Sequence, residues 1–214
     1  MNMGAGIELP GVGLTGIDKR PVSGPVEVRA PGLKGTGGSA LVGDEVCDLR
    51  HHGGNDQAVY AYAREDLEDW STYLERPLTP GSFGENLTTT GLDITGALIG
   101  ERWQIGDQVV LEVATARVPC RTFATWLETR GWVRTFTAKA VPGAYLRVIT
   151  PGRLRAGDPI RIVHRPDHDI TINLAFRALT RERDLLPRLL VADALPDEER
   201  QLALRRRLIE LDKA

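Results

Sequence analysis

The stretch Ile105-Gly106-Asp107-Gln108-Val109-Val110-Leu111 joins a tight turn directly to a run of β-favouring residues. Residues 156–163, Ala-Gly-Asp-Pro-Ile-Arg-Ile-Val, repeat the same order. Glycine accepts a positive φ, and the aspartate side chain can hydrogen-bond back to the turn. Gly-Asp ahead of a β-branched run therefore predicts entry into a strand. The recurrence indicates shared turn chemistry and favours a β-rich fold.

The chain before residue 166 continues this pattern. It holds most of the 23 glycines and 13 prolines, which separate short apolar segments. We expect strands at residues 26–29, 57–63, 109–113 and 145–149. Leu67, Trp70 and Leu74 share one helical face, which predicts a helix over residues 64–74, and shorter helices are expected at 122–127 and 132–140. Residues 1–166 are thus expected to form a domain that is mainly β with inserted helices.

Residues 167–214 differ in character, because they are poor in glycine and their apolar residues follow a helical period. Three helices are expected, the third starting at Pro196 and the acidic residues behind it. The apolar positions assigned to them are Leu174, Ala178 and Leu179, then Leu185, Leu186, Leu189 and Leu190, then Leu202, Leu208, Ile209 and Leu211. Three short helices cannot hold a large core alone, so we expect a small C-terminal α-helical domain docked on the first domain or on a partner.

Composition excludes several classes of function. The net charge of −2 predicts no general attraction to nucleic acid or acidic membranes, and the Arg205-Arg206-Arg207 run is interpreted as a solvated face. No apolar run approaches the roughly 20 residues of a membrane helix, and the N-terminus does not resemble a secretory signal. Two cysteines make no disulfide framework, although one disulfide stays open, so the cytoplasm is the expected location.

Cys120 is the first candidate for chemistry. Arg117 and Arg121 lie beside it, and nearby guanidinium groups favour the thiolate, the nucleophilic and metal-binding form. Pro119 restricts the backbone just before it. The alternative is a buried structural cysteine. Cys47 is expected in the core or on a strand surface.

Two further motifs suggest a ligand site. Residues 50–54 read Arg-His-His-Gly-Gly, where a cation and a histidine precede two glycines that let a backbone approach a ligand. Residues 83–87 read Phe-Gly-Glu-Asn-Leu, where Glu85 and Asn86 could orient a ligand. The alternatives are a tight turn and a β-turn with a polar rim. The glycine-rich residues 35–39 lack the Gly-Lys-Ser/Thr ending of a phosphate-binding loop and are interpreted as a flexible loop.

Other cofactor classes have little support. A zinc site could use Cys47, His51, His52 and Cys120, but the chain has no Cys-x-x-Cys or His-x-x-x-His motif. Local motifs for nicotinamide, serine-hydrolase and pyridoxal chemistry are also missing from the sequence.

Five blocks occur in an order that resembles the MOSC family, the domain type found at the C-terminus of molybdenum cofactor sulfurases. The blocks are Gly43-Asp44, residues 48–59, residues 83–87, Ile105-Gly106-Asp107 and residues 116–120. The resemblance covers about residues 10–165 and is nearest to stand-alone bacterial members of the YiiM type. The ending resembles the three-helix extension that many of them carry. Ala116 stands where the family usually has proline.

The resemblance implies a barrel-like β domain with a molybdenum cofactor, a pterin with a phosphate tail. It implies Cys120 as the molybdenum ligand, since a soft thiolate suits that metal, with Cys120 and His52 as the catalytic pair. The cofactor-binding residues expected are Arg50, His52, Gly53, Gly54, Glu85, Asn86, Arg117 and Arg121. Pyridoxal phosphate is not expected in this chain, which is too short to include the pyridoxal-dependent domain of a full sulfurase.

The resemblance also implies a reductase of N-hydroxylated compounds, such as hydroxylaminopurines or amidoximes, with a separate electron-transfer protein as partner. Two alternatives stay open. One is a non-catalytic carrier of the cofactor or of a persulfide sulfur on Cys120. The other is a cysteine hydrolase with Cys120 as nucleophile and His52 as base, oriented by Asp56. A homodimer is also left open.

Overall fold

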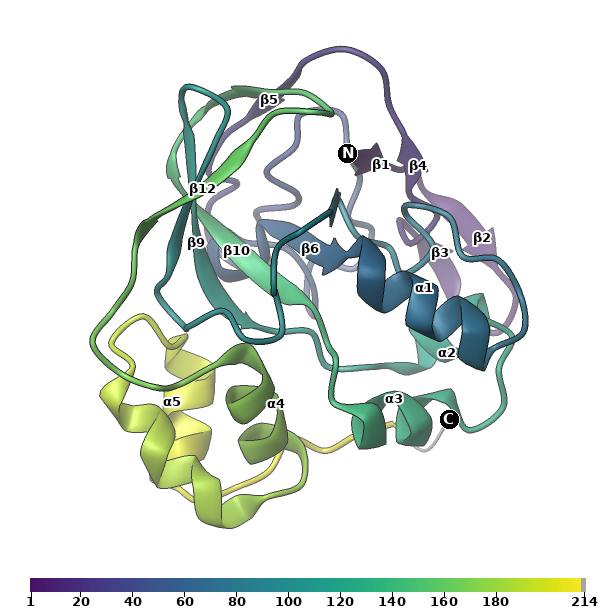
Figure 1. Cartoon of the computed structure of the whole chain (residues 1–214). Helices are drawn as coiled ribbons and strands as arrows, with labels where there is room; N and C mark the ends of the chain where they lie inside the picture. Colours follow the sequence, from purple (N-terminus) through teal and green to yellow (C-terminus); the bar gives the residue numbers. More distant parts are fainter. Residues whose placement is uncertain (213–214) are drawn as a thin grey trace.

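A curled six-stranded sheet lies at the centre of the computed structural model, which describes residues 1–212 (Figure 1). The sheet has the order β12-β8-β9-β10-β6-β7, and only the β6–β7 pair is parallel. Its strands are β6 (Val59–Ala63), β7 (Leu87–Thr89), β8 (Arg102–Ile105), β9 (Val109–Ala116), β10 (Ala144–Thr150) and β12 (Ile160–His164). The mainly β prediction for this part of the chain is confirmed.

Three two-stranded ribbons complete the β structure. They pair β1 (Asn2–Met3) with β4 (Arg20–Pro21), β2 (Ile7–Leu9) with β3 (Gly13–Thr15), and β5 (Val26–Val28) with β11 (Gly152–Leu154). The Gly-Asp turns are confirmed as strand entries. Gly106 and Gly157 have φ values of 60° and 92°, and the Asp158 carboxylate accepts the amide of Arg155 at 2.8 Å.

Three helices insert into the β domain close to their predicted bounds: α1 (Arg64–Tyr73), α2 (Arg121–Trp126) and α3 (Trp132–Lys139). Their buried faces meet in an aromatic cluster in which the ring centroids of Trp70 and Trp132 lie 4.7 Å apart and those of Phe83 and Phe123 lie 5.0 Å apart. Residue 57, predicted as the first of a strand, instead ends a 3₁₀ turn, η1 (Asn55–Gln57), and β6 begins at Val59.

The C-terminal extension contains α4 (Ile172–Thr180), η2 (Arg183–Val191) and α5 (Asp197–Leu204). The second helix is a 3₁₀ helix containing Pro187, which has no amide hydrogen to donate. The prediction for the third helix was wrong beyond Leu204. Arg206 takes a positive φ of 50°, which ends the helix, so Leu208, Ile209 and Leu211 lie in a tail. Lys213 and Ala214 lie outside the described residues.

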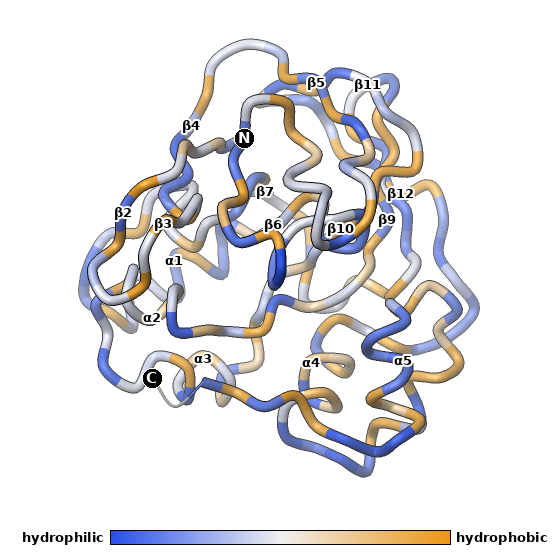
Figure 2. Tube along the Cα trace, turned by 180° about the vertical axis from the view of Figure 1, so that it is seen from behind, coloured by the Kyte–Doolittle hydropathy of each residue, from blue (hydrophilic) through white to orange (hydrophobic). Residues whose placement is uncertain are grey.

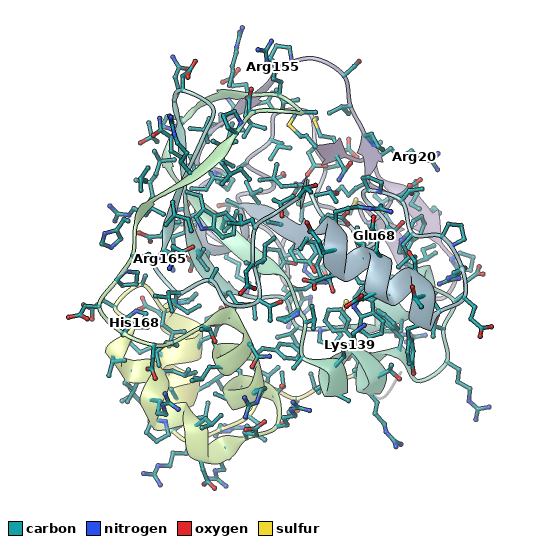
Figure 3. The ribbon with its side chains drawn as sticks, viewed as in Figure 1. Arg20, Glu68, Lys139, Arg155, Arg165 and His168 are labelled. Carbon is teal, nitrogen blue, oxygen red and sulfur yellow. The ribbon has the colours of Figure 1, made fainter. Side chains whose placement is uncertain are left out.

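The extension packs against the β domain. The buried side chains form one cluster that includes Val113 of β9 and Phe176 of α4, and Figure 2 shows hydrophobic segments in α4 as well as in the strands. Figure 3 shows Arg165 and His168 on the connection from β12 to α4, where Arg165 pairs with buried Glu101 at 3.1 Å. The division of the chain at residue 166 into two domains stays a prediction. Within residues 1–212, no helix is long and apolar enough to cross a bilayer.

Candidate active site

A cleft of about 380 Å³ opens beside the end of β9. Its walls come from residues 12–19, 39–60, 84–86 and 117–122 and from Tyr145 of β10. Of the predicted site residues, the cleft brings together His52, Gly53, Asn86, Arg117 and Cys120. His52 and Cys120, which are 68 positions apart in the sequence, therefore line the same cleft.

The thiol of Cys120 is available for chemistry because the local fold gives it no other task. β9 ends at Ala116, and the chain then runs through Pro119 to Cys120, which occupies the cap position of α2 in an extended conformation with φ −134° and ψ 173°. Its side chain makes no capping hydrogen bond, and it is half-buried. The thiol therefore lines the cleft without a structural role in the helix.

Arg117 is a buried cation without an anionic partner. Its side chain is 6% exposed and lines the cleft, with the guanidinium carbon 4.0 Å from the centroid of Phe123 and 4.9 Å from that of Tyr60. One Nη1 hydrogen is donated to the carbonyl of Phe83. Within residues 1–212, no carboxylate forms an ion pair with it. A guanidinium has five N–H donors, and burying its charge unpaired is unfavourable, so this position suits an anionic ligand.

His52 presents a neutral imidazole to the cleft. Burial, followed by repulsion from Arg117, lowers its pKa to about 4. At neutral pH the ring therefore keeps one acceptor nitrogen and one N–H donor. His51 differs, because it is exposed and pairs with Asp48 at 2.8 Å. Only the second histidine of the motif lines the cleft among the residues described.

The lowered pKa of His52 predicts a stability change at mildly acidic pH. Between the ordinary value of 6.5 and the folded value of about 4, the unfolded chain binds more protons than the native protein. Stability should therefore fall as pH decreases through this window, and His52→Gln should reduce that fall. Urea unfolding of both proteins from pH 4.5 to 7.5 measures the difference. Parallel curves for the two proteins would contradict the assignment.

Asn86 lines the cleft but is largely satisfied by the protein. Its Oδ1 accepts the amide of Tyr60 at 3.1 Å, and its Nδ2 donates to Asp44 Oδ2 at 2.9 Å. Asp44 also forms a buried ion pair with Lys19. This network fixes one wall of the cleft, so Asn86 shapes the site more than it offers free hydrogen-bonding groups.

Glu85 does not line the cleft, which corrects its prediction as a ligand-binding residue. Its buried carboxylate accepts hydrogen bonds from Gly81 N at 2.6 Å, Phe83 N at 3.0 Å and Thr88 Oγ1 at 2.8 Å. Burial raises the pKa of this carboxyl. Glu85 therefore braces the turn whose Phe83 carbonyl receives Arg117, and its influence on the cleft is indirect.

Replacing Glu85 with glutamine should destabilise the fold by about 1–2 kcal/mol. In the unchanged protein each carboxylate oxygen accepts a backbone N–H, whereas in the variant the NH₂ group of glutamine would face one of these donors and leave it without an acceptor. Chemical denaturation measures this loss. Glu68→Gln is the matched control, since the Glu68 carboxylate is 61% exposed in its pair with Arg64. Equal stability of the two variants would contradict the bracing role.

Arg50, Gly54 and Arg121 also lie outside the cleft lining, and both arginines are exposed. The two glycines are needed for the chain's own packing. A Cβ on Gly53 would lie 2.7 Å from the Gly37 carbonyl oxygen, and one on Gly54 would lie 2.6 Å from the Lys34 nitrogen. The absence of side chains at both glycines therefore lets residues 34–38 pack against them. Of the two, only Gly53 lines the cleft.

Several cleft residues gave no recognisable signal in the sequence. Tyr60 and Tyr145 face each other across β6 and β10, with ring centroids 5.1 Å apart, but strand register could not be read from the sequence. Gln57 lines the cleft, and its Oε1 is buried without a hydrogen-bond partner in the described chain. Cys47 also lines the cleft, whereas the core or a strand surface was expected.

The alternative chemistries receive little geometric support. In residues 1–212 no three His, Cys, Asp or Glu side chains gather to hold a metal ion, so the zinc set considered above is not assembled. Asp56, proposed to orient His52 in a hydrolase, instead pairs with Arg147 at 2.5 Å. Both cysteines are free thiols.

Comparison with known proteins finds a matching family and several similar proteins. The MOSC domain matches residues 48–161. The uncharacterized protein YflK of Bacillus subtilis is 32% identical over 163 residues, covering 76% of this chain and 70% of YflK. A Gibberella moniliformis protein named reductase is 34% identical over 157 residues, covering 70% of this chain but only 26% of the fungal protein. The crystal structure of YiiM from Geobacillus stearothermophilus is similar with a TM-score of 0.77 and 27% identity, covering 96% of each chain.

Proposed function

Because the chain belongs to the MOSC family, we propose that it binds a molybdenum cofactor in the cleft and reduces N-hydroxylated compounds. The observation that carries the proposal is the buried, unpaired guanidinium of Arg117 in the same cleft as the thiol of Cys120. A soft metal ligand and an anion-binding group then occupy one site. The fungal relative named reductase supports the reaction class.

The cleft residues fit such a cofactor. Cys120 would hold the metal through its sulfur, and Arg117 would bind an anionic group with its remaining N–H donors. Gln57 offers a buried amide oxygen that lacks a partner in the described chain, which suits an N–H donor of a heterocycle. Lys19, Asp44 and Asn86 fix one wall of the cleft.

A bound molybdenum centre would supply two-electron removal of oxygen from the N–OH group. The balanced reaction is R₂N–OH + 2e⁻ + 2H⁺ → R₂NH + H₂O. His52 is neutral at pH 7. Its N–H group can therefore donate a proton to the substrate while its other ring nitrogen accepts a proton from water. Burial raises the pKa of Tyr145, which keeps this phenol a donor at the cleft wall.

The electrons would come from a separate redox protein, which we propose as the partner. The two free thiols fit a reducing cytoplasm. We likewise propose that two copies of the chain can form a homodimer.

The experiment that tests the activity is turnover by cofactor-loaded protein with a chemical one-electron reductant. Hydroxylaminopurine and amidoxime substrates should yield the corresponding amine and amidine. Loaded protein that reduces neither class would contradict the reductase proposal and favour a carrier, in which the same thiol and guanidinium hold a cofactor or a persulfide anion without turnover. Hydrolysis by metal-free protein would favour the cysteine hydrolase.

A further inference from the structure

Two acidic side chains of the C-terminal extension contact residues on both sides of the cleft loop, defined here as residues 117–120. On one side, Thr115 Oγ1 donates to Glu199 Oε1 of α5 at 2.6 Å, two residues before Arg117. On the other side, the amide of Arg121, directly after Cys120, donates to Asp212 Oδ2 at 2.6 Å. The two contacts thus enclose the loop that carries the guanidinium and the thiol.

The cleft loop has few restraints of its own. It lies between the end of β9 and the start of α2, and it belongs to neither element. The Cys120 side chain makes no capping hydrogen bond, and Arg117 is attached through the Phe83 carbonyl. The position of the loop therefore depends on what fixes its two ends.

The contact at Glu199 is partly buried. Its Oε2 has no hydrogen-bond partner in the described chain, and burial raises the pKa of the carboxyl to about 7 against the opposing effect of the Thr115 hydrogen bond. The charged groups facing it are Asp56 of η1 and Glu198 of α5, which raise the pKa, and Arg147 of β10, which lowers it. A neutral carboxyl still accepts from Thr115, so glutamine should replace it without losing the contact.

The extension is fixed well enough to act as a support. Asn173 Nδ2 donates to the Ala140 carbonyl at 2.8 Å, and the amide of Ile172 donates to the Ala97 carbonyl at 2.9 Å. The tail after α5 is attached to α4, where Ile209 N donates to the Leu179 carbonyl at 2.8 Å. From there it runs towards α3 and α2, which brings Asp212 to Arg121 (Figure 1).

We propose that Glu199 and Asp212 are positioning residues that hold the cleft loop from both ends, so that the C-terminal extension sets the placement of Arg117 and Cys120. Neither side chain lines the cleft, so both act through the backbone and through Thr115. The relevance to cofactor binding rests on the function proposed above. The positioning itself is a property of the metal-free protein and can be measured there.

Amide hydrogen exchange of metal-free protein tests the proposal. Glu199→Ala and Asp212→Ala should each speed exchange in residues 115–121 by roughly fivefold to tenfold, the effect of one lost hydrogen bond. Glu199→Gln should behave like the unchanged protein. Glu198→Ala is the matched control, because this neighbouring carboxylate pairs with Lys34 at the surface and is 75% exposed.

A second measurement reads the thiol directly. In a Cys47→Ser background, the rate of Cys120 alkylation by iodoacetamide should change severalfold in the two alanine variants and stay constant in Glu199→Gln and Glu198→Ala. Thr115→Val removes only the donor of this hydrogen bond. It should give the same changes in exchange and alkylation as Glu199→Ala, and it replaces Glu199→Ala in the test if the alanine variant folds poorly.

Two results would overturn the proposal. One is unchanged exchange and alkylation in both alanine variants. The other is equally faster exchange throughout α4 and α5, which would mean that the extension had simply undocked. Because every readout uses metal-free protein, failure of the molybdenum proposal would leave this result unaffected.

Discussion

Replacing Cys120 with serine is expected to abolish molybdenum retention and reductase activity while the fold stays intact. A hydroxyl is a harder and far less acidic ligand than a thiol, so it should not replace the thiolate as a ligand for the metal. The fold should tolerate the change because the Cys120 side chain makes no capping hydrogen bond and is half-buried. Metal mass spectrometry of protein from a cofactor-competent host measures the loss, and thermal unfolding checks the fold.

Cys47→Ser is the matched control for Cys120→Ser, because it makes the same substitution at another cysteine that lines the cleft. Burial and the neighbouring Glu45 raise the pKa of this thiol, so it favours the protonated form, which is the poorer metal ligand. We expect near-normal molybdenum content in this variant. Full cofactor loading of Cys120→Ser would contradict the ligand assignment.

Replacing Arg117 with methionine should weaken cofactor retention by roughly 10- to 100-fold, since hydrogen bonds to charged groups contribute about 1.5–3 kcal/mol. The same change should alter the free energy of unfolding of metal-free protein by no more than about 1 kcal/mol, because loss of the Phe83 contact is offset by removal of a buried, unpaired charge. Denaturant titration of metal-free protein and cofactor content of loaded protein give the two values.

The control for Arg117 is Arg121→Met, which removes an exposed guanidinium outside the cleft lining. It should change neither value strongly. A large loss of stability in metal-free Arg117→Met, with cofactor retention unchanged, would show that Arg117 has a structural role instead of binding an anion.

The fold was predictable where local chemistry decides it. The Gly-Asp turns at residues 106 and 157 and the buried face of α1 depend on backbone freedom and helical period, and both are confirmed. The end of the third C-terminal helix was not predictable in this way. Its apolar residues continue past Leu204, but they pack from an extended tail in which Ile209 bonds to α4, and such tertiary contacts leave no periodic signal.

The site was predictable in part for a similar reason. Cys120, Arg117 and His52 could be named because reactive residue types occurred together with a family-like order of motifs. The sequence could not separate residues that line the cleft from those that support it. Glu85 and Asn86 are adjacent, yet one braces a turn and the other reaches the cleft. Tyr60 and Tyr145 meet only through strand register, which a single sequence does not reveal.

Molybdenum content with pterin fluorescence, measured on protein from a host whose other molybdoenzymes are loaded, tests the central claim most directly. The account predicts close to one molybdenum and one pterin per chain, both lost in Cys120→Ser and retained in Cys47→Ser. Protein without molybdenum or pterin from such a host would contradict the cofactor site and leave the cleft to a persulfide carrier or a hydrolase.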